Sequence, residues 1–244
     1  MADLRKTSRK QILKAIRYSV SNAKNFHIEA SHLLSKAYYT RACALNIMAI
    51  EEAGRAVAYS MLLHRDRHSM STKATKTWGR ILHRFHDTKI SLVYGAQKWK
   101  GLIASRIMSR RNNENVEGKY TDSRSKLFRL AEAYLIIDQL LKKLRLGDLQ
   151  DLKKRCLYVD FNTRKPTRPL IMTKKISEAL SIITNSEVGS VMALNEEIKR
   201  SKNYHLIEDL IDTITGYWEI GEVYRRIQDL EKKNRAHSDG QLAS

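Results

Sequence analysis

Apolar residues recur at helical spacing from the start of the chain. A first stripe follows three- and four-residue steps over residues 12–37, and Ser8 in front of it is a residue type that caps helices, as is Thr7. The next segment, residues 38–63, is apolar around most of its circumference. That pattern is typical of the central helix of a bundle. We expect a break near Lys36 between the two segments.

Helical spacing continues in the middle of the chain with polar interruptions. Residues 64–72 read as a polar connection, and apolar positions return at helical spacing over residues 78–107. The polar stretch 109–123 is expected to be a loop. A further helix is predicted over residues 127–144, and Gly147 is expected to end it.

The last third of the chain contains one segment of different character. Residues 156–161 are short and rich in β-preferring types, so we expect an extended segment laid over the bundle. Thr173 is expected to open a helix to about residue 183, and Ser186 to cap the next one. An amphipathic helix is predicted over residues 204–234, followed by a disordered tail, 235–244.

Composition agrees with an all-α fold and sets the domain organisation. The 244 residues include 10 glycines and 2 prolines, too few for closely turned β folds. We expect a basic N-terminal start of the first helix (1–20), a helical domain (21–200), a C-terminal amphipathic helix (201–234) and the tail (235–244). The chain is long enough to bury a sizeable core.

The charge balance points to an anionic partner. Forty-five Lys and Arg residues against 26 Asp and Glu residues give a net charge of +19. Residues 62–129 alone carry sixteen basic and five acidic side chains, a net charge of +11. Such a local field attracts nucleic acid or another polyanion, although a solvated surface is the alternative. We expect RNA as a partner.

Cysteine use and hydropathy favour a cytoplasmic protein without a membrane span. Cys43 and Cys156 lie far apart and outside any C-x-x-C pair, which is typical of a reducing compartment. No apolar run approaches the roughly 18 residues that a spanning helix needs. The basic first residues lack the apolar core of a secretory signal.

Two pairs of charges stand inside the apolar second segment. Glu51 precedes Arg55 by four residues and Glu52 precedes it by three, so both carboxylates can pair with the guanidinium on a helix. Charges in such a helix are costly unless they are paired. The structural interpretation is an ion pair that clamps the bundle. The functional one is that these groups orient site residues on a neighbouring helix.

A basic run with two histidines is the candidate catalytic site. His83, His86 and Lys89 are three residues apart, and Arg80 extends the row by one step. An imidazole transfers protons near neutral pH, and cations stabilise a phosphodiester transition state. We predict His86 and Arg80 as catalytic residues. Phosphate-binding roles are predicted for the neighbouring side chains Lys89, His83 and Arg84. The alternative is that these are ordinary basic surface residues.

Metal or cofactor chemistry has little support in the sequence. The pairs His64/His68 and His83/His86 have spacings that bring two ligands together. The chain has one Glu-x-x-His, at Glu29, whereas a di-iron bundle needs two. It has no glycine-rich phosphate loop and no H-E-x-x-H motif. We therefore expect neither a metal nor another cofactor.

Four features in this order resemble the AbiV group of abortive-infection proteins. Residues 44–55 (ALNIMAIEEAGR) are similar to its A-L-x-E-E-x-G-K pattern, with Arg55 in place of the more usual lysine. Trp78 and the His86–Lys89 spacing match the next two features. Residues 156–160 (CLYVD), with Tyr158 and Asp160, are similar to the L-Y-V-D motif. The resemblance runs from about residue 21 to about residue 197.

The resemblance implies a HEPN-like helical bundle with additional C-terminal helices. The HEPN superfamily is associated with dimers and with metal-independent ribonucleases that carry an Arg-x4-6-His motif. Arg80 and His86, with five intervening residues, satisfy that pattern numerically. On the predicted helix 127–144 the comparable element runs from Arg129 to Tyr134, with tyrosine where histidine is expected.

These inferences predict phage defence by abortive infection through action on RNA or translation. The first reading is a metal-independent HEPN-type ribonuclease that works as a homodimer. The main alternative is a non-catalytic helical module that senses or sequesters a phage protein or a host component. A generic basic nucleic-acid binder without a defence role is a third.

Overall fold

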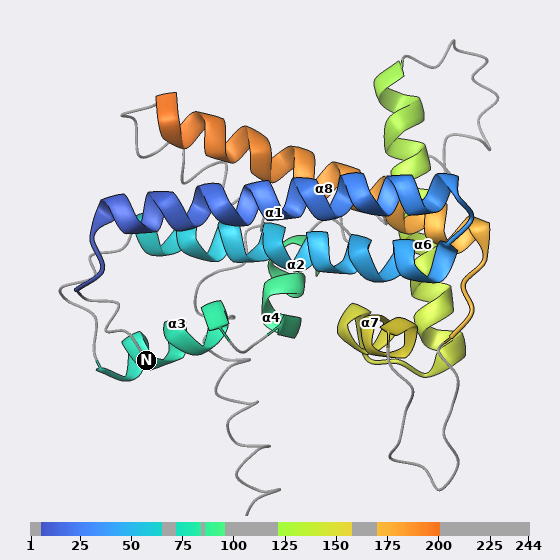
Figure 1. Cartoon of the computed structure of the whole chain (residues 1–244), viewed down its shortest axis with the longest axis horizontal. Helices are drawn as coiled ribbons and strands as arrows, with labels where there is room; N and C mark the ends of the chain where they lie inside the picture. The colour runs from blue at the N-terminus through green and yellow to red at the C-terminus, as the bar shows by residue number, and fades with distance from the viewer. Residues whose placement is uncertain (1–5, 65–71, 84–85, 96–121, 158–169, 201–244) are drawn as a thin grey trace, which may run out of the picture.

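The computed structural model describes residues 6–64, 72–83, 86–95, 122–157 and 170–200. In these ranges the chain is helical and contains no strand (Figure 1). The α-helices are α1 (Arg9–Ser35), α2 (Tyr39–His64), α3 (Thr72–His83), α4 (His86–Ile90), α6 (Asp122–Leu144), α7 (Leu149–Leu157) and α8 (Lys174–Arg200). A π-helical turn, η2 (Ser91–Gly95), follows α4. The predicted all-α fold is confirmed.

α1 and α2 form an antiparallel hairpin (Figure 1). Ser8 caps α1 through a capping box, in which its hydroxyl accepts from the Gln11 amide and the Gln11 side chain accepts from the Ser8 amide. The helix ends at Ser35, where Ala37 adopts a left-handed backbone with φ 62°. The predicted Ser8 cap and the predicted break near Lys36 are therefore confirmed.

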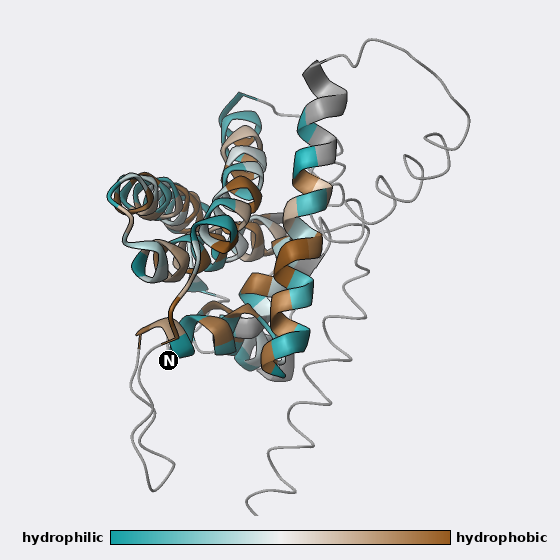
Figure 2. Ribbon diagram, turned by 90° about the vertical axis from the view of Figure 1, so that its right-hand side faces the viewer, coloured by the Kyte–Doolittle hydropathy of each residue, from teal (hydrophilic) through white to brown (hydrophobic). Residues whose placement is uncertain are grey.

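α2 is the central helix of the bundle. Most of its apolar side chains are completely buried, because α1, α8, α7 and α4 all pack against it. Apolar residues gather where the helices face one another, and polar residues lie on the outside (Figure 2). A helix buried on all sides accepts charges at a high cost in free energy. The four charged or polar groups that α2 nevertheless buries, Asn46, Glu51, Glu52 and Ser60, therefore mark places where a partner is needed.

Two predicted helix ends are wrong. α6 ends at Leu144, and the left-handed residue after it is Arg145 (φ 53°), two positions before Gly147. Ser186 does not start a helix, because α8 is continuous from Lys174 to Arg200. The core-facing stripe of α8 continues through Ile183 and Val188, so burial holds the helix together across the serine. The predicted start at Thr173 is confirmed, since its hydroxyl accepts from the Ile176 amide.

The prediction of an extended segment over residues 156–161 is wrong for its first two residues. Cys156 and Leu157 are the last residues of α7. Leu149, Leu152 and Cys156 lie on one side of this helix and are buried, and α7 packs against α2, so core contact outweighs the β preference of the segment. Residues 158–161 lie outside the described residues. The same holds for the predicted loop 109–123 up to residue 121, for the helix 204–234 and for the tail.

Candidate functional site

The site begins with a close approach between α2 and α4. Gly54 on α2 lies so near the Lys89 backbone that a Cβ atom on Gly54 would stand 1.7 Å from the Lys89 carbonyl oxygen. Any side chain at position 54 would therefore force the two helices apart. The approach brings His86 and Lys89 of the short helix α4 to Glu51, which lies almost one turn before Gly54.

Glu51 is the centre of a cluster drawn from three helices. Its side chain is 7% exposed and accepts from the His86 imidazole, whose Nδ1 lies 2.5 Å from Glu51 Oε1. Lys153 on α7 donates to Oε2 at 2.8 Å. Lys89 Nζ and Arg55 Nη2 lie 3.2 Å and 3.5 Å from Oε1. We call Glu51, Arg55, His86, Lys89 and Lys153 the Glu51 cluster.

The cluster fixes Glu51 as a carboxylate. Burial on its own raises the pKa of Glu51, but the hydrogen bond from Lys153, the charges of Lys89 and Lys153 and the hydrogen bond from His86 outweigh it. The pKa of Glu51 falls from 4.5 to about 2. Burial lowers the pKa of Lys89, whose side chain has no exposed surface, while the charge of Glu51 acts in the opposite direction. Glu51 is thus ionised at neutral pH.

An ionised Glu51 determines the tautomer of His86. A carboxylate has no proton to donate, so His86 Nδ1 must carry the hydrogen that bridges the 2.5 Å contact. In the neutral imidazole the lone pair then resides on Nε2. The side chain of His86 is 42% exposed, whereas Lys89 and Lys153 behind it are 0% and 12% exposed. This arrangement is that of a histidine held by a carboxylate at a surface with cations behind it.

Glu52 lies next to Glu51 on α2 and has a different environment. Arg55 Nη1 donates to Glu52 Oε1 at 2.5 Å, so Arg55 contacts both carboxylates. Burial raises the pKa of Glu52, and the charge of Arg55 and a hydrogen bond from Asn22 on α1 oppose that rise. The predicted pairs Glu51–Arg55 and Glu52–Arg55 are both present. The link from α2 to α4 and α7, however, is made by Glu51.

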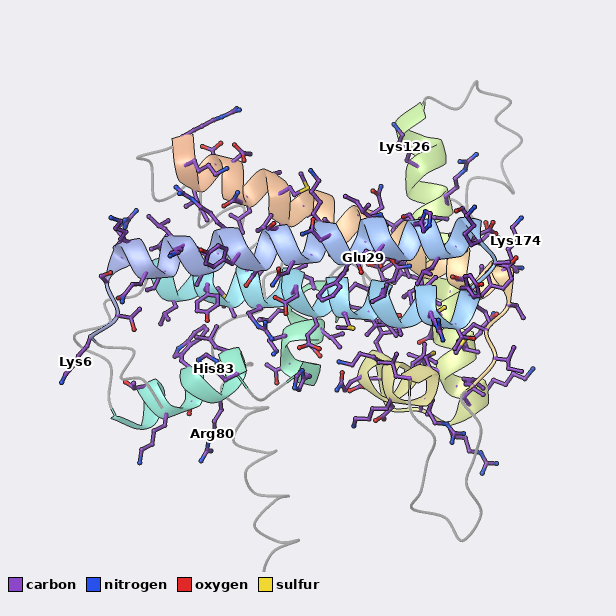
Figure 3. The ribbon with its side chains drawn as sticks, viewed as in Figure 1. Lys6, Glu29, Arg80, His83, Lys126 and Lys174 are labelled. Carbon is purple, nitrogen blue, oxygen red and sulfur yellow. The ribbon has the colours of Figure 1, made fainter. Side chains whose placement is uncertain are left out.

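The predicted basic row divides between two helices. His86 and Lys89 belong to α4 and point at Glu51, whereas Arg80 and His83 belong to α3. Figure 3 shows the Arg80 side chain directed away from α1 and α2. His83 is exposed, and burial of its ring followed by the charges of Arg55 and Lys89 lowers its pKa. Three other residues singled out in the sequence, Arg84, Tyr158 and Asp160, lie outside the described residues.

Lys153 is the member of the site that the sequence analysis missed. It lies 102 positions after Glu51 in the chain, in a helix that was not predicted. A signal existed in the sequence, since Leu149, Leu152 and Cys156 follow helical spacing and would place Lys153 beside them. The apolar pattern of α7 is short because the helix has only nine residues. The contact with α2 that buries it cannot be recognised from so short a pattern.

Another buried carboxylate, Glu187, lies on α8. Tyr134 on α6 donates to Glu187 on α8 at 2.5 Å, and both side chains are completely buried. The Tyr94 ring from η2 packs on Tyr134, with centroids 5.3 Å apart. Burial, the adjacent charge of Glu187 and their hydrogen bond raise the pKa of Tyr134. Tyr134 therefore stays protonated, and Arg129, which is exposed on α6, is not part of this pair.

The part of the chain that the structure describes includes both cysteines of the protein. It contains no group of three or more His, Cys, Asp or Glu side chains that could hold a metal ion. Burial raises the pKa of the Cys43 thiol to about 11 and that of the Cys156 thiol to about 12, so neither forms a thiolate nucleophile readily. None of the described helices combines the length and the apolar character needed to cross a bilayer.

Most of the chain matches one known protein family. The helical bundle matches a HEPN-type family model, which covers residues 11–189 of the 244. That model describes AbiV, and the chain belongs to the AbiV family. Membership indicates an abortive-infection function of the HEPN type. Neither the curated proteins nor the solved structures contain a match to the chain.

Proposed function

We propose that the protein defends against phage by abortive infection as a metal-independent endoribonuclease, with His86 as the proton-transfer group. The observation that carries this proposal is the 2.5 Å contact between His86 Nδ1 and Glu51 Oε1 beneath a half-exposed imidazole. Glu51 holds the ring in one tautomer, as an orienting carboxylate does in other acid–base sites. AbiV family membership supports the defence role.

The reaction uses the nucleophile that RNA itself supplies. His86 Nε2 takes the proton of a ribose 2′-hydroxyl as its oxygen attacks the adjacent phosphorus. The bond from phosphorus to the 5′-oxygen then breaks, and the leaving oxygen takes a proton from water. The products are a 2′,3′-cyclic phosphate and a 5′-hydroxyl. No metal is required, because the attacking group lies within the substrate.

We divide the predicted roles into two groups. His86 is accessible and acts on the substrate, whereas Lys89 has no exposed surface and acts through Glu51. We therefore assign Lys89 and Lys153 as positioning residues that keep Glu51 charged. Because the Arg80 side chain is directed away from α1 and α2, we propose for Arg80 a contact with a phosphate away from the reacting bond instead of the predicted catalytic role. His83 and Arg84 keep their predicted phosphate-binding roles as proposals.

The test is cleavage of an end-labelled RNA with EDTA present. We expect wild type to produce the cyclic phosphate and His86→Ala to cut about 10²–10⁴-fold more slowly. His32→Ala removes an exposed histidine on α1 and should cut at the wild-type rate. Nitrogen NMR of His86 reports its tautomer without reference to cleavage. A wild-type protein that binds RNA and never cuts it contradicts the catalytic role.

A non-catalytic binding module is the second function that a specific observation favours. Arg80 points away from the bundle in Figure 3, so arginine and histidine do not converge on one phosphate there. Such a module would sense or sequester a phage or host component. Phage protection that survives His86→Ala, in a protein without ribonuclease activity, would favour this reading.

The proposed setting is the cytoplasm, because RNA and the translation machinery are there. RNA and a phage protein are the proposed partners, together with a second copy of the chain. Exposed apolar side chains support self-association, among them Ile171, which is 87% exposed, and Tyr38, which is 57% exposed. Light scattering should give about twice the 28.2 kDa of one chain. A species of one chain at micromolar concentration would contradict the dimer.

A further inference from the structure

The exposed face of α1 carries a row of cations without an acidic side chain among them. Residues 6–24 contain six basic and no acidic side chains. Four of the basic residues, Lys10, Lys14, Arg17 and Lys24, follow one another at steps of four, three and seven positions, which places them on one side of the helix. At a rise of 1.5 Å per residue the row is about 21 Å long. All four side chains are exposed.

The row is held rigidly in position by the opposite side of α1. Ile12, Ile16, Val20 and Ala23 of that side are buried against the bundle. The cations therefore project from a fixed helix instead of from a flexible segment. Within the described ranges no ion pair is formed by any of the four, so their charge is available to a ligand.

An exposed aromatic ring stands within the row. Tyr18 is 60% exposed, and the Lys14 ammonium lies 5.5 Å from its ring centroid. Lys14 contacts one side of the ring, so the rest of its exposed surface is available to a ligand. Exposed aromatic rings among cations are how proteins bind single-stranded nucleic acid: the bases stack on the rings and the phosphates meet the cations.

One acidic side chain lies near the row and does not cancel it. Lys199 hydrogen-bonds to Glu196 on α8 at 2.6 Å and is the main reason why the pKa of Glu196 is low, while Arg17 adds a smaller effect. Glu196 is thus already paired with a cation of its own helix. The net charge of the row stays positive.

We propose that Lys10, Lys14, Arg17, Tyr18 and Lys24, the α1 basic face, bind single-stranded nucleic acid. The cations contact phosphates, and a base stacks on the side of the Tyr18 ring away from Lys14. This surface is separate from the Glu51 cluster, because α1 lies in front of the bundle while α4 and α7 pack beneath α2 (Figure 1). The inference goes beyond the proposed ribonuclease, since binding here requires no cleavage.

The test measures binding by fluorescence anisotropy over a series of salt concentrations. The probe is a labelled 2′-O-methyl oligouridine, which cannot be cut by attack of its own 2′-oxygen. Binding is therefore measured whether or not the protein is a nuclease. The triple variant Lys10→Gln, Lys14→Gln, Arg17→Gln should bind at least ten-fold more weakly. Its slope of log affinity against log salt should flatten by about 2, at roughly 0.7 per lost contact to a single strand.

The matched control removes the same charge elsewhere. Lys143→Gln, Lys154→Gln, Lys175→Gln replaces three exposed lysines on α6, α7 and α8 and should bind like wild type. Tyr18→Ala should weaken binding about five-fold or more, whereas Tyr18→Phe, which keeps the ring, should not. Equal weakening in the control triple would mean that net charge alone drives binding, and would overturn the proposal.

Two further ligands distinguish the binding of single strands at this surface from the binding of a duplex and of a membrane. Single-stranded DNA should compete with the probe, because both share phosphates and stackable bases, and a duplex of equal length should compete less well. Preference for the duplex would overturn the single-strand assignment. Vesicles of phosphatidylcholine and phosphatidylserine in equal parts should not bind. If the triple variant loses vesicle binding and keeps oligonucleotide binding, α1 is a membrane surface and the proposal is wrong.

Discussion

Among the buried carboxylates of the described helices, Glu51 and Glu187 have surroundings that give them opposite properties. Glu51 meets an imidazole and three cations and lies behind a histidine that is 42% exposed. Glu187 meets the hydroxyl of Tyr134 in an interior where both side chains have no exposed surface. The His86 imidazole beside Glu51 is open to a ligand at the surface, and we propose that it transfers a proton there. The Tyr134–Glu187 pair is enclosed by α6, α8 and η2.

The difference shows how to recognise chemistry in an all-helical interior. A buried acid is itself no sign of function, because buried polar groups are ordinarily accommodated by hydrogen bonds such as the one that Tyr134 donates to Glu187. The Glu51 cluster is distinguished by excess positive charge and by a titratable group at the solvent boundary. Changes at Glu51 should therefore affect stability and activity together, whereas changes at Tyr134 should affect stability alone.

The largest effect is expected from Glu51→Gln. The amide keeps the shape of the side chain and removes its charge, so Lys89 and Lys153 lose the carboxylate that they contact directly. Breaking a buried pair in this way costs about 3–5 kcal/mol of unfolding free energy. Urea denaturation measures the loss. Glu178→Gln, at a position 49% exposed, is the control and should change stability by about 0.5 kcal/mol or less. Equal midpoints for the two variants would show that the cluster contributes nothing.

An acid titration should show the charge on Glu51 directly. Its pKa is 4.5 in its ordinary state and about 2 in the folded protein, so the carboxylate favours folding at every pH above 4.5. That contribution, about 3 kcal/mol, is lost as the pH falls from about 4.5 to about 2. The stability gap between wild type and Glu51→Gln should therefore close over this range.

The same titration tests Lys153. Without the Lys153 hydrogen bond, burial has a larger share in the pKa of Glu51, which rises. Lys153→Met should accordingly lose stability at a higher pH than wild type does. Lys154→Met, which alters an exposed neighbour on α7, should follow the wild-type curve. If the difference in stability between wild type and Glu51→Gln stays constant down to about pH 2, Glu51 does not carry the assigned charge.

Gly54→Ala should move α4 away from α2 and so disrupt the Glu51 cluster without changing any charge. The added methyl group would meet the Lys89 backbone, so α4 must move and carry His86 away from Glu51. Overpacking costs about 1–3 kcal/mol, and a clash with backbone belongs at the upper end. Gly189→Ala meets no atom within 4 Å and should stabilise α8 by about 0.5–1 kcal/mol. Thermal unfolding of both variants checks the contrast, and a neutral Gly54→Ala would contradict the close approach.

Much of this arrangement can be predicted from the sequence, because helical periodicity is a local property. The positions of α1 and α2 follow from apolar spacing, and Arg55 lies within one turn of both carboxylates, so its pairs follow from position alone. His86 and Lys89 were recognised as a chemical pair. Their direction was not predicted, because it depends on Gly54, which has no side chain and allows α4 to approach.

Contacts between distant segments could not be predicted in the same way. Lys153 meets Glu51 across 102 positions, and spacing carries no information about such a contact. The same holds for Tyr134 and Glu187, which are 53 positions apart on two amphipathic helices. The helix boundaries predicted at Gly147 and Ser186 are wrong for a related reason: they were based on residue preference, without knowledge of the packing of the helices. Residue preference suggested a stop, whereas packing against α2 and α6 continued α8 past the serine.

The smallest effect is expected from Tyr134→Phe. This variant tests whether the Tyr134–Glu187 pair contributes to stability alone. The change removes one hydroxyl and leaves the ring in contact with Tyr94, so the unfolding free energy should fall by about 1–2 kcal/mol. RNA cleavage and phage protection should be unchanged at a temperature where the variant is folded. Tyr39→Phe, on a partly buried tyrosine of α2, controls for loss of a hydroxyl at another site. If Tyr134→Phe stays folded and loses protection while His86→Ala keeps it, the roles of the two carboxylates are reversed, and the functional site lies between α6 and α8.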